Sequence, residues 1–229
     1  AAVLMGAKPE DKNIVTAHIG NGISLAAIKN GICIDTTMGL TPNEGPMMGT
    51  RSGSIGIFAH LLKAIPGLDC SELENILNRK SGLYGITGGY NDLIYIEDHV
   101  DLDPRCELAM NMLSYQLRGF LGSMLFNLGR ADAIVFTAGA GENHYQLRSR
   151  ILEGLEEYGI NLDNERNRKA TRNQKNELIS TDSSKVKIYK IPTNEELVIA
   201  MDSAAILDGT YKVHTEFEYP FQLPSYWGL

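Results

Sequence analysis

A glycine-rich segment near the start of the chain has the composition of a phosphate-binding loop. Residues 18–22 read His-Ile-Gly-Asn-Gly. Glycines let backbone N–H groups approach a bound anion, and the ring of His18 adds another donor. The same residues also fit an ordinary tight turn between two strands. Two interpretations of this segment stay open, a phosphate site and a structural turn.

A second glycine-rich segment lies in the middle of the chain. Residues 139–143 read Gly-Ala-Gly-Glu-Asn, after an apolar run and before a helical pattern. Backbone N–H groups and the helix dipole favour phosphate at such a junction. His144 stands where the dinucleotide fingerprint G-x-G-x-x-G needs its third glycine, which argues against a Rossmann enzyme. The alternative is a structural turn in which Asn143 caps the next helix.

Two charged side chains in loop-like segments could serve the same chemistry. Arg51 is flanked by glycines, and an arginine in an open loop can hold phosphate oxygens through its planar guanidinium. An ordinary surface arginine is the alternative. Glu195 follows a predicted strand, and a carboxylate beside a phosphate site can hold Mg²⁺, usually through water. Its neighbour Glu196 stands three residues after Thr193, the spacing of a capping box.

These segments need a scaffold that brings them together, and the hydrophobic pattern predicts one. Short runs of β-branched residues between glycine turns predict strands, and apolar positions three and four residues apart predict helices. The predicted strands are residues 13–19, 23–29, 32–37, 132–138 and 186–191. Helices are expected at 55–64, from Ser71 onward, from Pro104 onward, after Asn143 and at 194–209, with 161–185 as an irregular polar connection. The order β-β-β-α-β-α-β-α predicts an α/β domain with a mixed sheet.

Composition narrows the possible partners. The chain has 229 residues and a net charge of -7, with 28 acidic against 21 basic residues, so no nucleic acid is expected to bind. No apolar run approaches the roughly 20 residues that span a bilayer, and no signal peptide opens the chain. We expect no membrane partner and a cytoplasmic location. Because the first residue is not Met, we also expect a piece of a longer protein.

Taken in order, six motifs resemble the C-terminal half of the acetate kinase family, across nearly all of residues 1–209. The motifs lie at residues 18–22, 37–45, 48–53, 80–82, 136–143 and 191–196. The resemblance implies a ribonuclease H-like domain, the fold of actin, sugar kinases and acetate kinase. It also implies in-line transfer of the γ-phosphoryl group of ATP to acetate, which gives acetyl phosphate and ADP and requires Mg²⁺.

The same resemblance implies roles for individual residues. Arg51 would be catalytic, and Glu195 would support Mg²⁺. The nucleotide-binding residues would be His18, Ile19, Gly20, Asn21, Gly22, Asp92, Leu93, Ile94, Gly139, Ala140, Gly141, Glu142 and Asn143. The family has Asp-Phe-Arg where this chain has Asp92, Leu93 and Ile94, so an arginine beside the adenosine is missing.

The resemblance also sets expectations for the whole molecule. Residues 1–211 would be the C-terminal nucleotide-binding domain, 212–229 an unassigned tail, and this half the main contact of a homodimer. The family's active site lies between two similar domains, so we expect weak nucleotide binding and little acetate turnover from this half alone. The rival interpretations are a kinase for propionate or another short acid and a non-catalytic half-protein that binds nucleotide or dimerises.

Overall fold

After two 3₁₀ turns, Val3–Met5 and Pro9–Asp11, the chain forms three antiparallel strands in the computed structural model, which describes residues 1–171, 175–213 and 216–228. These strands are β1 (Asn13–Ile19), β2 (Ile23–Lys29) and β3 (Ile32–Thr36). Ile19 pairs with Ile23, which leaves residues 20–22 as the first turn. At the second turn Asn30 and Gly31 both have positive φ, 50° and 78°, as a type I′ turn requires. The predicted antiparallel opening is confirmed.

Later strands extend this sheet on the side of β1. β4 (Ala133–Thr137) runs parallel to β1, β6 (Lys187–Lys190) runs parallel to β4, and the short β5 (Glu177–Leu178) lies antiparallel at the edge. The strand order is β3-β2-β1-β4-β6-β5. The mixed sheet and the ribonuclease H-like α/β class are confirmed. Because β1, β4 and β6 point the same way, their carboxyl ends meet at one edge, where ligands bind in open α/β sheets.

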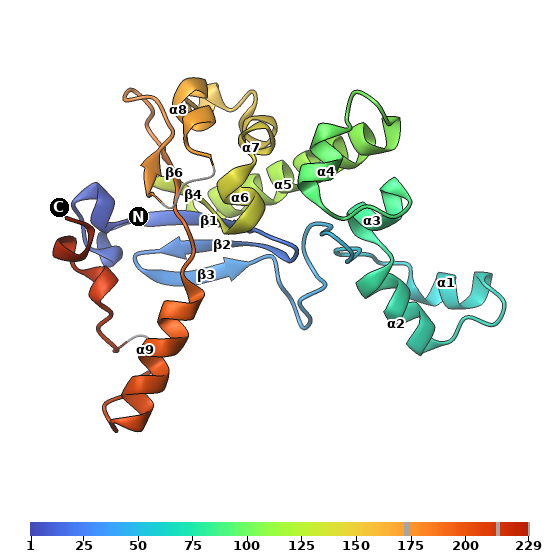
Figure 1. The fold of residues 1–229 in the computed structure, drawn as a ribbon, viewed down its shortest axis with the longest axis horizontal. Helices are drawn as coiled ribbons and strands as arrows, with labels where there is room; N and C mark the ends of the chain where they lie inside the picture. Colours follow the sequence, from blue (N-terminus) through green and yellow to red (C-terminus); the bar gives the residue numbers. More distant parts are fainter. Residues whose placement is uncertain (172–174, 214–215, 229) are drawn as a thin grey trace.

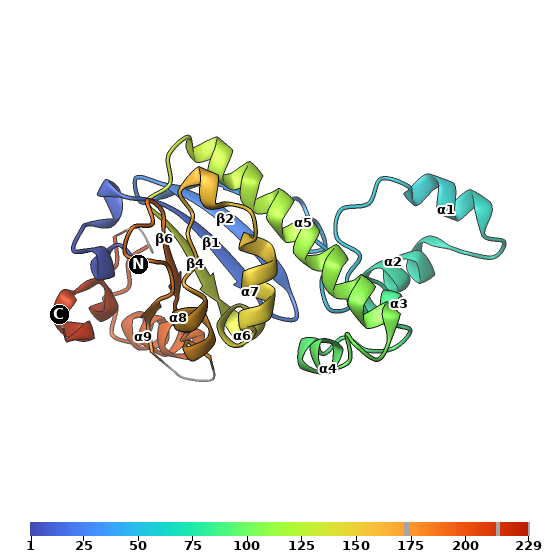
Figure 2. The ribbon, with the colours of Figure 1, turned by 90° about the horizontal axis from the view of Figure 1, so that it is seen from above.

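One face of the sheet is covered by α5 (Pro104–Leu128) and α7 (Tyr145–Leu152), as Figure 2 shows. Asp103 caps α5 and accepts a hydrogen bond from Arg105 N at 2.9 Å, with Pro104 in the first turn. This start agrees with the sequence-based prediction. The other face is packed by the N-terminal segment, in which Ala2 joins Ile14 and Val135 in a smaller apolar cluster.

Four short helices separate β3 from α5 and extend beyond the end of the sheet (Figure 1). They are α1 (Phe58–Ala64), α2 (Cys70–Arg79), α3 (Gly82–Thr87) and α4 (Leu93–Asp98), together called the helical arm. The arm packs on the N-terminal part of α5 through α3 and α4. The predicted element order is therefore correct in outline, and it includes α1 and α2 of the arm but not α3 and α4.

Two local predictions are wrong. Residues 161–185 contain α8 (Asn164–Lys169) and β5, because Asp163 caps the helix and β6 offers β5 a pairing edge. In addition, α9 (Glu195–Leu207) is capped by Asn194, whose Oδ1 accepts from Leu197 N at 3.1 Å. Thr193 and Glu196 do not form the predicted capping box.

The C-terminal tail packs beside α9. Its longer described stretch, 216–228, contains short 3₁₀ turns at Pro220–Gln222 and Pro224–Trp227 and lies on the same side of the sheet as the N-terminal segment (Figures 1 and 2). Tyr219 Oη donates to Asp202 Oδ1 of α9 at 2.7 Å. Residues 214, 215 and 229 of the predicted tail lie outside the described residues. Among the helices that the structure describes, none has the length and apolar character to cross a bilayer.

Candidate active site

A cavity of about 240 Å³ lies at the carboxyl end of β1. Its lining brings together five of the predicted site residues, His18, Gly20, Asn21, Gly22 and Arg51. The first four come from β1 and the turn that follows, and Arg51 comes from a loop almost thirty residues further along the chain. The sequence motif and the distant arginine therefore share one site.

The backbone holds the loop of Arg51 against the turn. Gly49 N donates to Asn21 O at 3.2 Å, and Met48 N donates to Arg51 O at 3.0 Å. The guanidinium donates from Nη1 to Pro42 O at 3.2 Å. A Cβ added at Gly22 would lie 3.3 Å from the same Nη1, so the glycine lets Arg51 approach the turn. Within the described part of the chain no carboxylate pairs with Arg51, which leaves its charge available to an anion.

Gly82, at the start of α3, packs closely against the backbone of the Arg51 loop. It has φ +60°, and a Cβ there would lie 2.1 Å from Met48 O and 2.6 Å from Arg51 O. No side chain fits at that distance. Leu83 N also donates to Met48 O at 2.9 Å, so the helical arm determines where the Arg51 loop lies.

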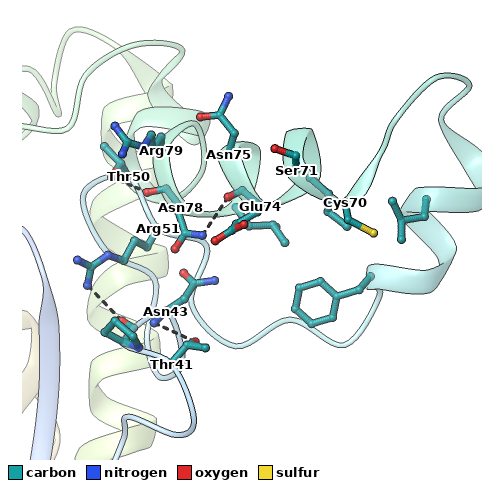
Figure 3. Close-up of a pocket in the computed structure, with 15 residues that line it drawn as sticks. Thr41, Asn43, Thr50, Arg51, Cys70, Ser71, Glu74, Asn75, Asn78 and Arg79 are labelled. Carbon is teal, nitrogen blue, oxygen red and sulfur yellow. Dashed lines mark hydrogen bonds between the residues drawn. The ribbon is translucent and has the colours of Figure 1, made fainter.

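A larger cavity, about 1110 Å³, lies on the arm side of Arg51 (Figure 3). α1 and α2 line it, with Asn43 and Thr50 of the loop nearer Arg51 and Cys70 at the far side. Thr50 Oγ1 donates to Asn78 O at 3.0 Å, which ties the loop to the end of α2. Arg51 and Pro42 line both cavities, and Arg51 therefore stands at the border between them.

The second glycine segment forms a helix of its own, α6 (Ala138–Asn143). It follows β4 directly, and Ala138 adopts φ 65°, a conformation that costs a non-glycine residue free energy. The prediction that Asn143 caps the next helix is wrong, because His144 holds the cap position of α7 and Asn143 Nδ2 donates to Gly139 O at 2.9 Å. A Cβ at Gly139 would face open space.

Two predicted residues of these segments turn their side chains inward. Ile19 is fully buried in the core. Glu142 is only 6% exposed, and its Oε1 accepts from both N and Oγ1 of Thr193. Its carboxylate therefore anchors the segment that leads into α9.

Glu195, by contrast, is exposed at the first position of α9. Its side chain is 73% exposed, and Oε1 lies 3.9 Å from His18 Nε2, whose own side chain is 38% exposed. Residues 177 positions apart are thus brought near each other because β1 and β6 end at the same edge of the sheet. The predicted metal residue lies beside the predicted phosphate turn.

The segment of Asp92 lies in the helical arm and does not line the 240 Å³ cavity. Asp92 caps α4 by accepting from Ile94 N at 2.9 Å, Leu93 is buried, and Ile94 is exposed. The residue before it, Asn91, lies close to the turn, since a Cβ at Gly49 would be 3.5 Å from Asn21 O and 3.6 Å from Asn91 O.

Comparison with known proteins identifies the family of this chain. The model of the acetokinase family matches residues 1–201. The chain belongs to the acetokinase family. It is 48% identical to the acetate kinase of Trichlorobacter lovleyi, across 99% of this chain and 54% of that protein.

Comparison with solved structures leads to the same family. The acetate kinase of Porphyromonas gingivalis superimposes with a TM-score of 0.83 at 40% identity, over 89% of this chain and 51% of the other. The propionate kinase of Francisella tularensis gives 0.77 at 37% identity, over 87% and 50%. This acetokinase chain spans about half the length of the curated relatives it matches.

One important residue of this acetokinase chain gave no signal in its sequence. Arg148 of α7 is completely buried, and its guanidinium donates to the carbonyl oxygens of Gly141, Glu142, Asn167 and Ala170 and to Asn167 Oδ1. Burial lowers the pKa of Arg148 to about 10, so the group stays charged at neutral pH. It joins the end of α6 to the end of α8. An arginine within a helical stripe ordinarily faces solvent.

The residues at this acetokinase site fit Mg²⁺ only in a water-mediated form. In the ranges that the structure describes, no group of three His, Cys, Asp or Glu side chains could enclose a metal ion. Mg²⁺ commonly keeps several waters and takes one or two carboxylates plus substrate phosphates. The exposed carboxylate of Glu195 beside His18 meets that requirement.

Proposed function

We propose that residues 1–211 are the C-terminal, nucleotide-binding domain of an acetate kinase, with 212–229 as a tail. The reaction would be the reversible transfer of a phosphoryl group from ATP to acetate. The observation that carries this proposal is the 240 Å³ cavity in which Arg51 meets the glycine turn and His18. Membership of the acetokinase family and the likeness to solved acetate kinases support it.

Phosphoryl transfer asks a protein mainly to position the reactants and to stabilise negative charge. The guanidinium of Arg51 has no carboxylate partner among the described residues, so it could stabilise the charge on the moving phosphoryl group. Backbone groups of the turn at 20–22 and the ring of His18 would contact the phosphates. Residues 139–143 would hold the nucleotide, together with the segment at Asp92, Leu93 and Ile94.

Mg²⁺, when bound, would neutralise phosphate charge. Glu195 is the residue proposed to hold it, through water. Its Oε1 lies 3.9 Å from His18 Nε2, at the phosphate end of the site. We further propose a cytoplasmic homodimer. The side chains of Leu108, Tyr115 and Phe126 support a subunit interface, because they leave an exposed apolar stripe on α5.

A kinase for propionate is the second candidate. The propionate kinase structure matches this chain almost as well as the acetate kinase structure does, with TM-scores of 0.77 and 0.83. Comparing turnover of acetate, propionate and butyrate by the intact enzyme would separate the candidates. A non-catalytic half-protein would bind nucleotide and turn over none of the three acids.

Calorimetric titration of this chain with Mg·ATP tests the proposal. Arg51→Ala should weaken binding by about tenfold or more, since hydrogen bonds to charged groups contribute roughly 1.5–3 kcal/mol. Arg130→Ala is the matched control, because Arg130 is an exposed arginine before β4, at the opposite end of that strand from Thr137. Equal affinity of Arg51→Ala and the wild-type chain would contradict the proposed role. In the intact enzyme, unchanged acetate turnover by Arg51→Ala would do the same.

The α6 segment can be tested with a closer control. Asn143 and Asn78 both donate from Nδ2 to the carbonyl four residues earlier, at 2.9 Å, on two different helices. Alanine at either position therefore removes the same local hydrogen bond. Only Asn143→Ala should weaken binding of Mg·ADP, and equal effects of the two substitutions would argue against a nucleotide contact at Asn143.

A further inference from the structure

A buried pair joins the helical arm to the end of α6. His144 Nδ1 lies 2.7 Å from Glu97 Oε2, with side chains only 7% and 13% exposed. Such pairs are strong when both members are removed from water. Glu97 Oε1 is buried and, in the described structure, has no hydrogen-bond partner. In the described structure, His144 is therefore the side chain that binds this carboxylate.

The two members of the pair stand at the ends of separate segments. Glu97 lies on α4, a helix of six residues that Asp92 caps, and the chain before that cap lies next to Gly49 and the turn at Asn21. His144 follows α6 directly and begins α7. α4 therefore follows the segment next to the phosphate turn, and its Glu97 reaches the residue that closes α6.

The phosphate end of the site is held independently of this pair. Gly49 N bonds to Asn21 O, and the Arg51 loop bonds to the start of α3. α4 itself is docked on α5 by the buried side chains of Leu93 and Ile96. Loss of the pair would leave α4 attached to the arm and the Arg51 loop in place. Without the pair, the distance between α4 and α6 would no longer be held.

We propose that Glu97 and His144 are positioning residues that set the distance between the 92–94 segment and the 139–143 segment. The pair would thereby govern affinity for the nucleoside part of the nucleotide, while affinity for the phosphates depends on the Arg51 cavity. This inference rests on the proposed nucleotide site. The pair would affect binding of the nucleoside part of the ligand and leave binding of the phosphates unchanged.

Binding of two probes tests the nucleoside part and the phosphate part of the nucleotide separately. Mg·ADP and Mg·pyrophosphate are titrated into the wild-type chain, Glu97→Ala, His144→Ala and Glu97→Gln, with Glu107→Ala on the exposed start of α5 as control. Glu97→Ala and His144→Ala should each weaken ADP binding about tenfold and leave pyrophosphate binding unchanged. Glu97→Gln keeps an acceptor for the His144 ring and should restore most of the ADP affinity. The double alanine variant should bind ADP no more weakly than either single variant.

Four results would contradict the inference, and they can be told apart. Unchanged ADP affinity in both alanine variants removes the positioning role. Equal weakening of ADP and pyrophosphate, with a lower melting temperature, would show general destabilisation instead. A wild-type chain that binds neither probe overturns the proposed function itself, and the inference with it. Amide hydrogen exchange of residues 93–98 without ligand should be faster in Glu97→Ala, and an unchanged rate would show that the pair does not hold α4.

Discussion

Glu142 Oε1 accepts two hydrogen bonds from Thr193, from the backbone N at 2.9 Å and from Oγ1 at 3.0 Å. The two residues are 51 positions apart, one on α6 and one just before α9. This contact determines where the chain enters α9, and Glu195 is the first residue of that helix. A buried carboxylate of the glycine segment thus positions the residue proposed to support Mg²⁺.

Thr193→Val tests this contact with little change of shape. Valine loses the Oγ1 donor but keeps the backbone N–H, so the free energy of unfolding should fall by about 1 kcal/mol. Glu142→Ala removes the acceptor of both bonds and should cost about 2–3 kcal/mol. Urea unfolding measures both, with exposed Glu107→Ala as control. A smaller loss for Glu142→Ala than for Thr193→Val would contradict the assignment.

Arg148→Met should be among the most destabilising substitutions in the chain. It removes the donor to four carbonyl oxygens and one amide oxygen in a buried site, and we expect a loss of about 3–5 kcal/mol. Arg79→Met on the exposed end of α2 should change stability by less than about 0.5 kcal/mol. Thermal unfolding of the two variants gives the comparison. Similar melting temperatures would show that the carbonyl groups find other partners.

Gly82→Ala should displace the Arg51 loop. Gly82 and Gly67 both have positive φ, +60° and +80°, so alanine strains the backbone at either position. Only at Gly82 would the new Cβ meet backbone atoms, at 2.1 Å from Met48 O, whereas nothing lies within 4 Å at Gly67. The difference between the two variants therefore isolates the steric clash from the strain. Gly82→Ala should abolish Mg·ATP binding, and Gly67→Ala should preserve it.

The tail should respond to high pH through Tyr219. Burial, followed by the hydrogen bond to Asp202, raises the pKa of Tyr219 to about 12. An unfolded tyrosine titrates near 10. Between these values the folded chain keeps a proton that the unfolded chain has lost, so the stabilisation is complete below pH 10 and disappears as pH rises through 12. Spectrophotometric titration should lose one late-titrating phenol in Tyr219→Phe, and an unaltered curve would contradict the assignment.

Local patterns were sufficient for the framework of this domain. Asn30-Gly31 accepts positive φ at both positions, and this turn sets the β2 and β3 pairing that the sequence predicts. Asp103 and Pro104 mark the start of α5 because capping and a fixed φ are local effects. The glycine segments after β1 and β4 were also recognised from their composition. Because β1 and β4 are parallel, their carboxyl ends place both segments at one edge of the sheet.

Where two local signals competed, the sequence pointed to the wrong one. Thr193 with Glu196 and Asn194 alone are both acceptable starts for α9, and Glu142 decides between them by binding Thr193 from another part of the chain. Asn143 resembled a helix cap, yet the residues before it already form α6. The first of these outcomes depends on a residue 51 positions away along the chain.

The sequence by itself determined the strands other than β5, the long helix and the identity of the glycine loops, because turns, caps and hydrophobic periodicity act over a few residues. Only the tertiary structure decided that Arg51 lies against Gly22, that Glu195 lies near His18, and that buried Arg148 and the Glu97–His144 pair hold α6 in place. Apart from the bonds between Arg148 and α6, those contacts join segments that are tens of residues apart. Their geometry follows from how the arm, the sheet edge and α6 pack together, and packing between distant segments leaves no periodic signal in the chain.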